Sequence, residues 1–242
     1  MTAATPVPAT LLVAADASVL QAAARWNGWG AVPRPVARPA LIEQRIELRL
    51  ASDPAGFREV VAQLRGPLAH DVSDDVLAHR ELAALTPPRP LSAFRVGAAL
   101  QAAFLRRLYR EGQRRSAVPW PVLAALNYVE SDFGRLREAS VAGAQGPMQF
   151  MSAAWRTYGR GDIHDPRAAI PAAARFLRAA GAPRDLRAAL DRYNPSSTYV
   201  DAILRYARRI TRDPRVYLVF YARRLIVRTP SGPRLLPDAG VR

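Results

Sequence analysis

The sequence has 242 residues, enough to bury the core of one domain together with a smaller accessory region. Half of the residues are hydrophobic, no cysteine occurs, and all 35 basic residues are arginines, which give a formal net charge of +15. The lack of cysteine excludes disulfides, thiol nucleophiles and cysteine-based metal sites. Apolar residues recur mainly at helical spacing, so the sequence predicts a mostly α-helical protein.

The positive charge has two interpretations. It can serve a polyanionic partner such as nucleic acid, an anionic lipid surface or an acidic cell-wall polymer. It can equally reflect a coding bias toward arginine, because the arginines are spread over the whole chain and can simply solvate helix faces. No aromatic and basic stripe or known motif marks a nucleic-acid-binding protein, so we expect no nucleic-acid partner.

The apolar segments are too short for a membrane span, which needs ~18–20 residues. We therefore expect no transmembrane segment. The first Ala/Leu/Val stretch is interrupted by Asp16 and follows no basic region, which is not typical of a signal peptide. An export signal, if one exists, is expected upstream or to have been removed.

The first part of the chain predicts a helical N-terminal region, residues 1–90, with a disordered start and a proline-rich linker. Residues 1–10 are expected to be disordered, and 26–40 to form a loop because they combine Asn-Gly-Trp-Gly with three prolines. Helices are expected over 11–25, 41–51, 53–66 and 73–85, the third starting with the cap-plus-proline pair Asp53-Pro54. The string Thr86-Pro-Pro-Arg-Pro90 is the clearest boundary.

Residues 91–242 predict a second helical unit that ends in a small β-hairpin. Helices are expected over 96–115, from Pro119 to Gly134, over 152–158, 168–180, 185–193, from Ser196 or Ser197 to Thr211, and over 213–221. Ser152, either Ser196 or Ser197, and Asp213 are expected to cap their helices. The segments 225–229 and 234–236 flank a Pro-Ser-Gly-Pro turn and predict the hairpin.

One carboxylate stands out in this second unit. An apolar helical pattern (Leu123, Leu126, Val129) leads directly to Glu130, and a Gly/Ala-rich loop follows. Apolar surroundings disfavour the charged form of a carboxyl group and raise its pKa, which suits a general acid at neutral pH. The simpler interpretation is a surface glutamate at a helix end.

The neighbours of Glu130 complete a longer pattern. It comprises Glu130-Ser131, Phe133-Gly134, Gly143-Ala-Gln-Gly-Pro-Met-Gln-Phe150, Trp155, Tyr158-Gly159, Asp162, Asp165-Pro166, Ala169-Ile170, Ala189-Leu190 and Tyr193-Asn194. In order and spacing this pattern resembles the soluble lytic transglycosylases of the lysozyme-like superfamily. The resemblance covers Leu100–Arg209. Two positions depart from it: Pro147 replaces the usual Leu before Met-Gln, and Arg192 replaces the Ala that commonly precedes Tyr-Asn.

The resemblance implies a lysozyme-like α-helical catalytic domain acting on peptidoglycan glycan strands. The expected reaction cleaves the β-1,4 bond between N-acetylmuramic acid and N-acetylglucosamine and closes a 1,6-anhydro ring. Glu130 would protonate the leaving oxygen and then, as a carboxylate, accept the proton of the C6 hydroxyl. The N-acetyl group of the substrate would assist. This substrate implies an extracytoplasmic location.

The resemblance also assigns roles to five substrate-binding residues. Ser131 would orient Glu130 or touch the N-acetyl group, although a serine at a helix end can also simply bond to backbone. Gln149 would hydrogen-bond the sugar. Met148 would shape the floor of the cleft or, equally, pack in the core. Tyr193 would hydrogen-bond the catalytic carboxyl group, and Asn194 would bind the substrate.

The residues themselves offer no second catalytic acid. Glycosidases with two carboxylates place the second one ~5–9.5 Å from the first, whereas substrate-assisted enzymes need only one. The segment Gly143–Met151 contains no acid, and Asp132 lies too close in sequence to Glu130 to share its side of a helix. Asp162 and Asp165 belong to a Gly/Pro turn, where Asp is common. The pattern therefore favours a single acid.

The sequence predicts no metal site and no cofactor. The three histidines (His70, His79, His164) are far apart and have no partner at ligand spacing, and the setting of His164 between two Asp is too short and turn-like to define a site. The four tryptophans (Trp26, Trp29, Trp120, Trp155) could stack on sugar rings, although Trp120 and Trp155 stand at helix starts and are expected in the core.

Two alternatives remain open. A muramidase on the same fold would use water as acceptor and would need a second carboxylate to activate it. A non-catalytic cell-wall-binding protein could keep the fold without the reaction, but the presence of Glu130, Gln149 and Tyr193 argues against it. The sequence leaves the oligomeric state open.

Overall fold

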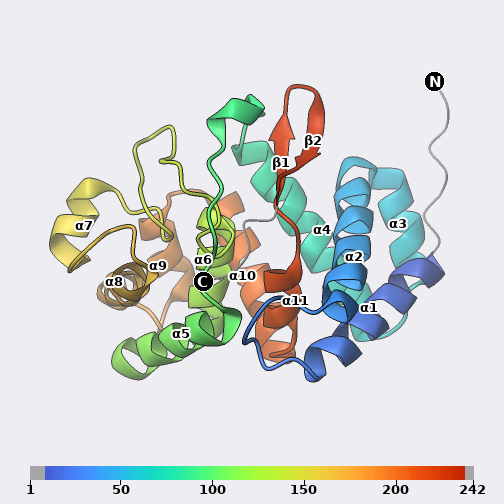
Figure 1. The fold of residues 1–242 in the computed structure, drawn as a ribbon, viewed down its shortest axis with the longest axis horizontal. Coiled ribbons are helices and arrows are strands. Elements are labelled where there is room, and N and C mark those ends of the chain that lie inside the picture. Colours follow the sequence, from blue (N-terminus) through green and yellow to red (C-terminus); the bar gives the residue numbers. More distant parts are fainter. Residues whose placement is uncertain (1–8, 238–242) are drawn as a thin grey trace.

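The computed structural model describes residues 9–237. In this part the chain forms eleven α-helices, one short 3₁₀ helix (η1, Leu91–Ala93) and a two-stranded antiparallel sheet near the C-terminal end (Figure 1). The mostly α-helical fold with a small hairpin is therefore confirmed. The expected disorder of residues 1–10 falls largely on residues 1–8, which lie outside the described part, whereas Ala9 and Thr10 are already helical.

The N-terminal region forms four helices: α1 (Ala9–Ala24), α2 (Arg34–Ser52), α3 (Pro54–Gln63) and α4 (Pro67–Leu85). The loop expected over 26–40 is wrong from Arg34 onward. Pro33 and Pro35 stand at the start of α2, where the absent proline N–H groups would have no intrahelical partner anyway. For the same reason α4 starts at Pro67, its first residue, rather than at Ser73.

The second unit contains α5 (Ala102–Ser116), α6 (Trp120–Ser131), α7 (Ser152–Tyr158), α8 (Pro166–Ala179), α9 (Leu186–Tyr193), α10 (Ser197–Arg212) and α11 (Val216–Ala222). Two starts differ from expectation. Val96 forms an antiparallel bridge with Leu136, so α5 begins only at Ala102. Asp213 accepts a hydrogen bond from the Arg215 N–H (2.9 Å) at the end of α10, which delays α11 to Val216.

The expected helix caps at Asp53 and Ser196 are present, and Asp185 forms a further one that was not predicted. The side chains of Asp53, Asp185 and Ser196 accept hydrogen bonds from backbone N–H groups in the first turns of α3, α9 and α10. Such caps satisfy amides that have no intrahelical partner. Ser152 was expected to cap α7 but is its first helical residue, because Met151 occupies the capping position.

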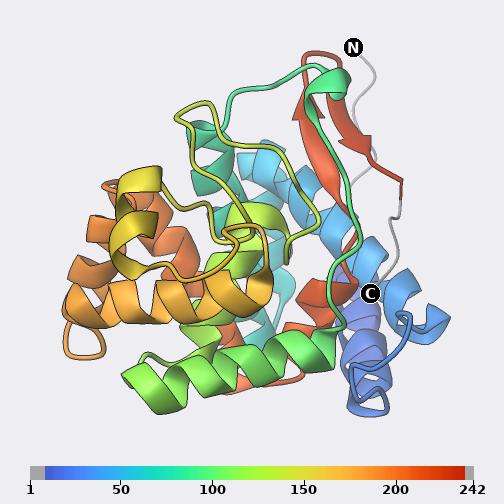
Figure 2. The same cartoon turned by 60° about the vertical axis from the view of Figure 1, so that its left-hand side comes forward.

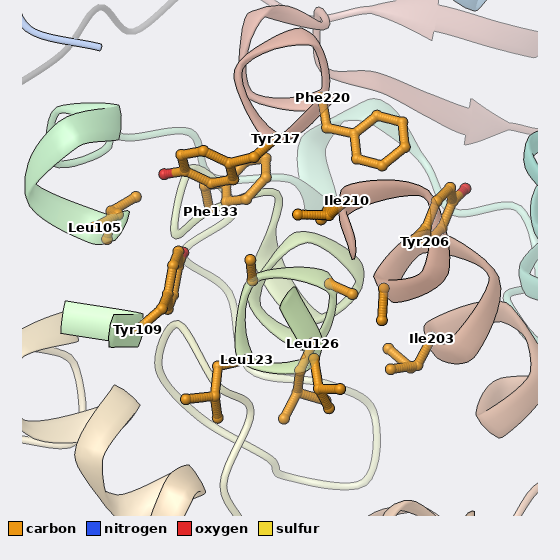
Figure 3. Packing of buried hydrophobic residues seen from close by; sticks show 14 of the residues in the cluster. Leu105, Tyr109, Leu123, Leu126, Phe133, Ile203, Tyr206, Ile210, Tyr217 and Phe220 are labelled. Carbon is orange, nitrogen blue, oxygen red and sulfur yellow. The ribbon is translucent and has the colours of Figure 1, made fainter. Parts of the chain in front are cut away.

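Helix α6 lies at the centre of the main hydrophobic core. All residues from Pro121 to Asn127 are buried, and side chains from α5, α10 and α11 surround the helix (Figure 3). Around it, aromatic rings meet edge to face, such as Tyr109 with Tyr217 at 5.9 Å between centroids. This packing holds the C-terminal end of α6 in a fixed place.

The N-terminal region contributes to the same core. Val19 of α1, Ala40 of α2 and Ala78 of α4 belong to the main cluster, while Leu12, Leu50 and other residues of α1–α4 form a second, smaller one. The proline-rich segment 86–90 lies alongside the hairpin, because the Arg89 N–H donates to the Arg228 carbonyl (3.1 Å). A division of the chain at residue 90 stays a prediction.

The C-terminal hairpin consists of β1 (Ile226–Thr229) and β2 (Gly232–Leu235), paired in the register Ile226↔Leu235 and Thr229↔Gly232. Figure 2 shows the segment before α5 running beside it. Leu225 and Val227 pack there with Phe94 and Val96 in a third small cluster. No helix within residues 9–237 is both long and apolar enough to cross a bilayer.

Candidate active site

Glu130 lies in the last turn of α6, where the helix ends abruptly. Asp132, Phe133 and Gly134 all adopt left-handed backbone conformations (φ 49°, 61° and 82°), so the chain turns away directly after Ser131. A buried phenylalanine in this conformation is costly, and the packing of the Phe133 ring on Tyr128 (5.2 Å between centroids) compensates for it. The turn leaves Glu130 half-buried at the end of a buried helix.

A tyrosine from α10 hydrogen-bonds the carboxyl group of Glu130. The Tyr199 hydroxyl donates to Glu130 Oε1, and the Tyr199 side chain is itself buried. Burial raises the pKa of Glu130 from 4.5 to about 7, and the hydrogen bond from Tyr199 opposes that rise because it stabilises the carboxylate. At neutral pH the group can therefore both donate and accept a proton, as a general acid and base must.

The expected partner of this carboxyl group was Tyr193, and that prediction is wrong. The Tyr193 hydroxyl donates to the Met148 carbonyl instead (2.6 Å). Tyr193 still lies close enough to Glu130 for the carboxylate charge to raise the pKa of the phenol, after the larger effect of burial. One signal could have pointed to Tyr199: the cap at Ser196 places residue 199 in the first turn of α10, directly after the Tyr-Asn motif.

Ser131 is fully buried, and its hydroxyl is engaged by backbone groups. Its hydroxyl donates to the Pro147 carbonyl (2.6 Å) and accepts from the Gly134 N–H (2.9 Å). Asn127 donates to the same carbonyl (2.7 Å) and accepts from the Tyr109 hydroxyl (2.6 Å). Of the alternatives for Ser131, the structure supports bonding to backbone: Ser131 and Asn127 tie the glycine-rich loop to the end of α6.

The glycine-rich loop closes on itself. Gln145 and Phe150 exchange two backbone hydrogen bonds (2.9 and 2.8 Å), and the Gln149 amide donates to the Gly146 carbonyl (2.9 Å). Gly146 is required here, because a Cβ atom would stand 2.0 Å from the Ile163 carbonyl oxygen. Met148 is fully buried, so of its two interpretations the structure favours core packing. Gln149 is half-buried.

Asn194 lies in the turn between α9 and α10, between the two tyrosines. It is half-buried, its N–H donates to the Leu190 carbonyl (3.0 Å), and its carbonyl accepts from the Ser196 N–H (2.8 Å). The structure thus brings Glu130, the loop at Met148 and the turn that carries Tyr193, Asn194 and Tyr199 together. Substrate contacts of Gln149 and Asn194 stay predictions.

The other acids near the site have different partners. Asp132 pairs with Arg135 (3.4 Å), and Asp162 and Asp165 accept backbone N–H groups in their turn (2.9 Å each). Among the described residues, no second carboxylate contributes to the pKa shift of Glu130. The geometry therefore offers one titratable acid with a neutral hydrogen-bond donor beside it.

The described residues form no metal-binding cluster, and the tryptophans lie in different surroundings. Residues 9–237 contain no group of three His, Asp or Glu side chains that could hold a metal ion. Trp120 and Trp155 pack edge to face on Tyr217 (5.8 Å) and Phe150 (5.4 Å). Trp26 is buried, whereas Trp29 is 50% exposed.

Comparison with known proteins gives one family. Residues 107–208 match the family model of the transglycosylase SLT domain. The matched stretch contains α6 with Glu130, the glycine-rich loop and the turn between α9 and α10. No curated protein and no solved structure gives a significant match to the chain.

Proposed function

We propose that this protein is a peptidoglycan lytic transglycosylase. The premise is that residues 107–208 form a domain of the soluble lytic transglycosylase type. In this proposal it cleaves the β-1,4 bond between N-acetylmuramic acid and N-acetylglucosamine and leaves a 1,6-anhydro end. Glu130 is the catalytic acid and base, and no cofactor takes part.

In the first step the protonated Glu130 gives its proton to the glycosidic oxygen. The bond from C1 of the muramic acid to that oxygen breaks, and the N-acetyl oxygen of the same sugar bonds to C1. The pKa of about 7 keeps a large fraction of Glu130 protonated at neutral pH. Because the Tyr199 hydroxyl occupies Oε1, we assign the transferred proton to Oε2.

In the second step the Glu130 carboxylate accepts the proton of the C6 hydroxyl. The C6 oxygen bonds to C1 and displaces the N-acetyl oxygen, which closes the anhydro ring and returns Glu130 to its protonated form. The Tyr199 hydrogen bond stabilises the carboxylate between the two steps. The loop at Gln149 and the turn at Asn194 are the proposed contacts for the sugars.

One observation carries this proposal: Glu130 is an acid with a raised pKa and a neutral tyrosine as its partner, and no other carboxylate within residues 9–237 contributes to that shift. A hydrolase of the same fold would need such a carboxylate to activate water. The proposed substrate also places the protein outside the cytoplasmic membrane.

Digestion of purified peptidoglycan by the wild type and by Glu130→Gln tests the proposal. We expect anhydro-ended fragments, identified by mass, from the wild type, and a rate lower by at least about 10²-fold for the variant, because general acid–base catalysis is typically worth that much. Glu59→Gln, at an exposed position of α3, is the matched control and should retain activity.

Two results would overturn the proposal. Fragments heavier by one water molecule would make the protein a muramidase. An absence of cleavage by the wild type, with the fold verified by circular dichroism, would favour a non-catalytic cell-wall-binding protein.

A further inference from the structure

A pocket that Glu130 does not line lies on the side of the glycine-rich loop that faces the turn at Asp162. It has a volume of about 560 Å³, and its polar and aromatic lining includes Trp29, Gln101, Arg137, Asp162, His164 and Arg167. On one side of the loop, the carbonyls of Pro147 and Met148 accept hydrogen bonds from Ser131 and Tyr193, near Glu130. On the other side, Gly146 lies against Ile163, in the turn that forms one wall of the pocket. The pocket thus joins the N-terminal region to the SLT-type domain.

Trp29 is held rigidly at the rim of this pocket. Its carbonyl accepts from the Trp26 indole N–H (2.9 Å), and the adjacent Gly30 N–H donates to Gln101 Oε1 (3.0 Å). The Gly28 carbonyl accepts from the Ala103 N–H (3.0 Å), in a contact so close that a Cβ atom at Gly28 would lie 2.9 Å from that nitrogen. A half-exposed indole on a fixed loop offers a preorganised flat apolar surface to a ligand.

The charged residues of the pocket balance one another. Asp162 and Asp165 stand with Arg137 and Arg167, and the Arg167 guanidinium lies over the Phe104 ring (5.0 Å). The two aspartates and two arginines cancel in charge, so the lining mixes hydrogen-bond donors and acceptors around the rings of Trp29 and Phe104. Such a lining fits a neutral ligand rich in hydroxyl and amide groups.

A different pocket shows what an anion site would look like here. Between α5 and α8 lies a pocket of about 490 Å³ whose charged lining residues are Arg115, Arg160 and Arg175. Burial and then the charges of Arg160 and Arg115 lower the pKa of Arg175, as expected where positive groups converge. The Trp29 pocket lacks this excess of positive charge, so a polyanion is the less suitable ligand for it.

We propose that the Trp29 pocket is an accessory saccharide site that binds N-acetylated amino sugars, separate from the glycan at Glu130. The identity of the polymer rests on the proposed function. Trp29 stacks on a sugar ring, while Gln101, Asp162 and His164 hydrogen-bond its hydroxyl and amide groups. Because Trp29 comes from the N-terminal region, this region then helps to hold the glycan strand.

Titration with a defined saccharide tests this site directly. The full chain carrying Glu130→Gln, labelled with ¹⁵N, is titrated with the tetrasaccharide of N-acetylglucosamine, and the Trp29 indole N–H resonance is followed, assigned by its loss in Trp29→Phe. We expect a saturable shift of that resonance. His164→Ala should weaken the binding by roughly 3- to 10-fold, the usual effect of one hydrogen bond, whereas the exposed His70→Ala should leave it unchanged.

Three outcomes would overturn the inference: a Trp29 resonance that the tetrasaccharide does not move, equal affinity in the His164→Ala and His70→Ala proteins, or a shift that inorganic phosphate produces and the tetrasaccharide does not. The readout requires no cleavage. A failure of this site therefore remains distinguishable from a failure of the proposed reaction, which the fragment masses report.

Discussion

Two buried acidic centres lie toward opposite ends of α10, and they differ in the charge of their partners. At the N-terminal end Tyr199 reaches Glu130, and near the C-terminal end Arg209 reaches Asp75 of α4. Glu130 has a neutral donor beside it, and its pKa rises to about 7 because burial prevails over the hydrogen bond. Its proton is therefore available for transfer near neutral pH.

Asp75 is buried completely but has two cationic partners. Burial alone would raise its pKa, yet the guanidinium groups of Arg209 and Arg223 together hold the pKa of Asp75 below its usual range. Arg223 Nη2 lies 2.9 Å from Asp75 and 2.8 Å from Glu47 of α2. The difference between the two centres teaches that two cationic partners can outweigh burial, as at Asp75, whereas a single neutral donor does not at Glu130. At Glu47 burial still prevails over Arg223 and raises the pKa.

Removal of Arg223 should have the largest effect on stability. Arg223→Met keeps a similar volume but leaves Asp75 and Glu47 with less positive charge in a buried place, so we expect the free energy of unfolding to fall by about 3–5 kcal/mol. The loss should shrink on acidification. The low pKa of wild-type Asp75 gives stability that disappears as the pH falls, while protonation relieves the unpaired acids of the variant.

Urea unfolding at several pH values measures this effect. Arg224→Met is the matched control. Arg224 follows Arg223 in the chain, but its side chain is only half-buried and makes a weak hydrogen bond to the Leu236 carbonyl (3.4 Å). Equal losses for the two variants, or a loss for Arg223→Met that does not change with pH, would contradict the structural role assigned to this centre.

Glu130 should behave in the opposite way, because its charged form is the unfavourable one. The folded state raises its pKa from 4.5 to about 7, so this group disfavours folding increasingly as the pH rises through that interval. Glu130→Gln removes the charge and should stabilise the protein at pH 8 by roughly 1–3 kcal/mol while abolishing most activity. Thermal unfolding at pH 4 and pH 8 measures this gain in stability. An equal gain at both pH values, or the same gain in Glu59→Gln, would contradict a raised pKa at Glu130.

The sequence predicts best those features that depend only on residues close together in the chain. The apolar run ending at Glu130 and the caps at Asp53 and Ser196 depend on neighbouring residues, and they appear in the structure where expected. The starts of α2 and α4 were missed, since prolines taken as loop signals occupy the first helical turns instead. A proline marks a boundary, but the sequence alone does not say which side of it is helical.

Contacts between distant elements were beyond reach of the sequence. Tyr193 and Tyr199 both lie near the Tyr-Asn motif, and which hydroxyl reaches Glu130 depends on how α10 packs against α6. The pairing of Arg223 with Asp75 joins two of many charged residues far apart in the chain, and no periodicity selects that pair. The Trp29 pocket likewise exists only because the N-terminal region folds against the loop at Asp162.

The smallest effect is expected from Tyr199→Phe, which leaves the ring in place and removes only the hydroxyl. Without this donor the carboxylate of Glu130 loses stabilisation, so the pKa of Glu130 should rise further above about 7. Since the first step needs the protonated acid, the decline of kcat/KM at high pH should move to higher pH, and the maximal rate should fall by roughly 3- to 10-fold, as for one hydrogen bond.

Tyr193→Phe is the matched control. It removes a hydrogen bond to the Met148 carbonyl and should leave the pH of that decline unchanged. A shift caused by Tyr193→Phe and not by Tyr199→Phe would return the role to the residue that the family pattern indicates, and would mean that the turn between α9 and α10 rearranges when substrate binds.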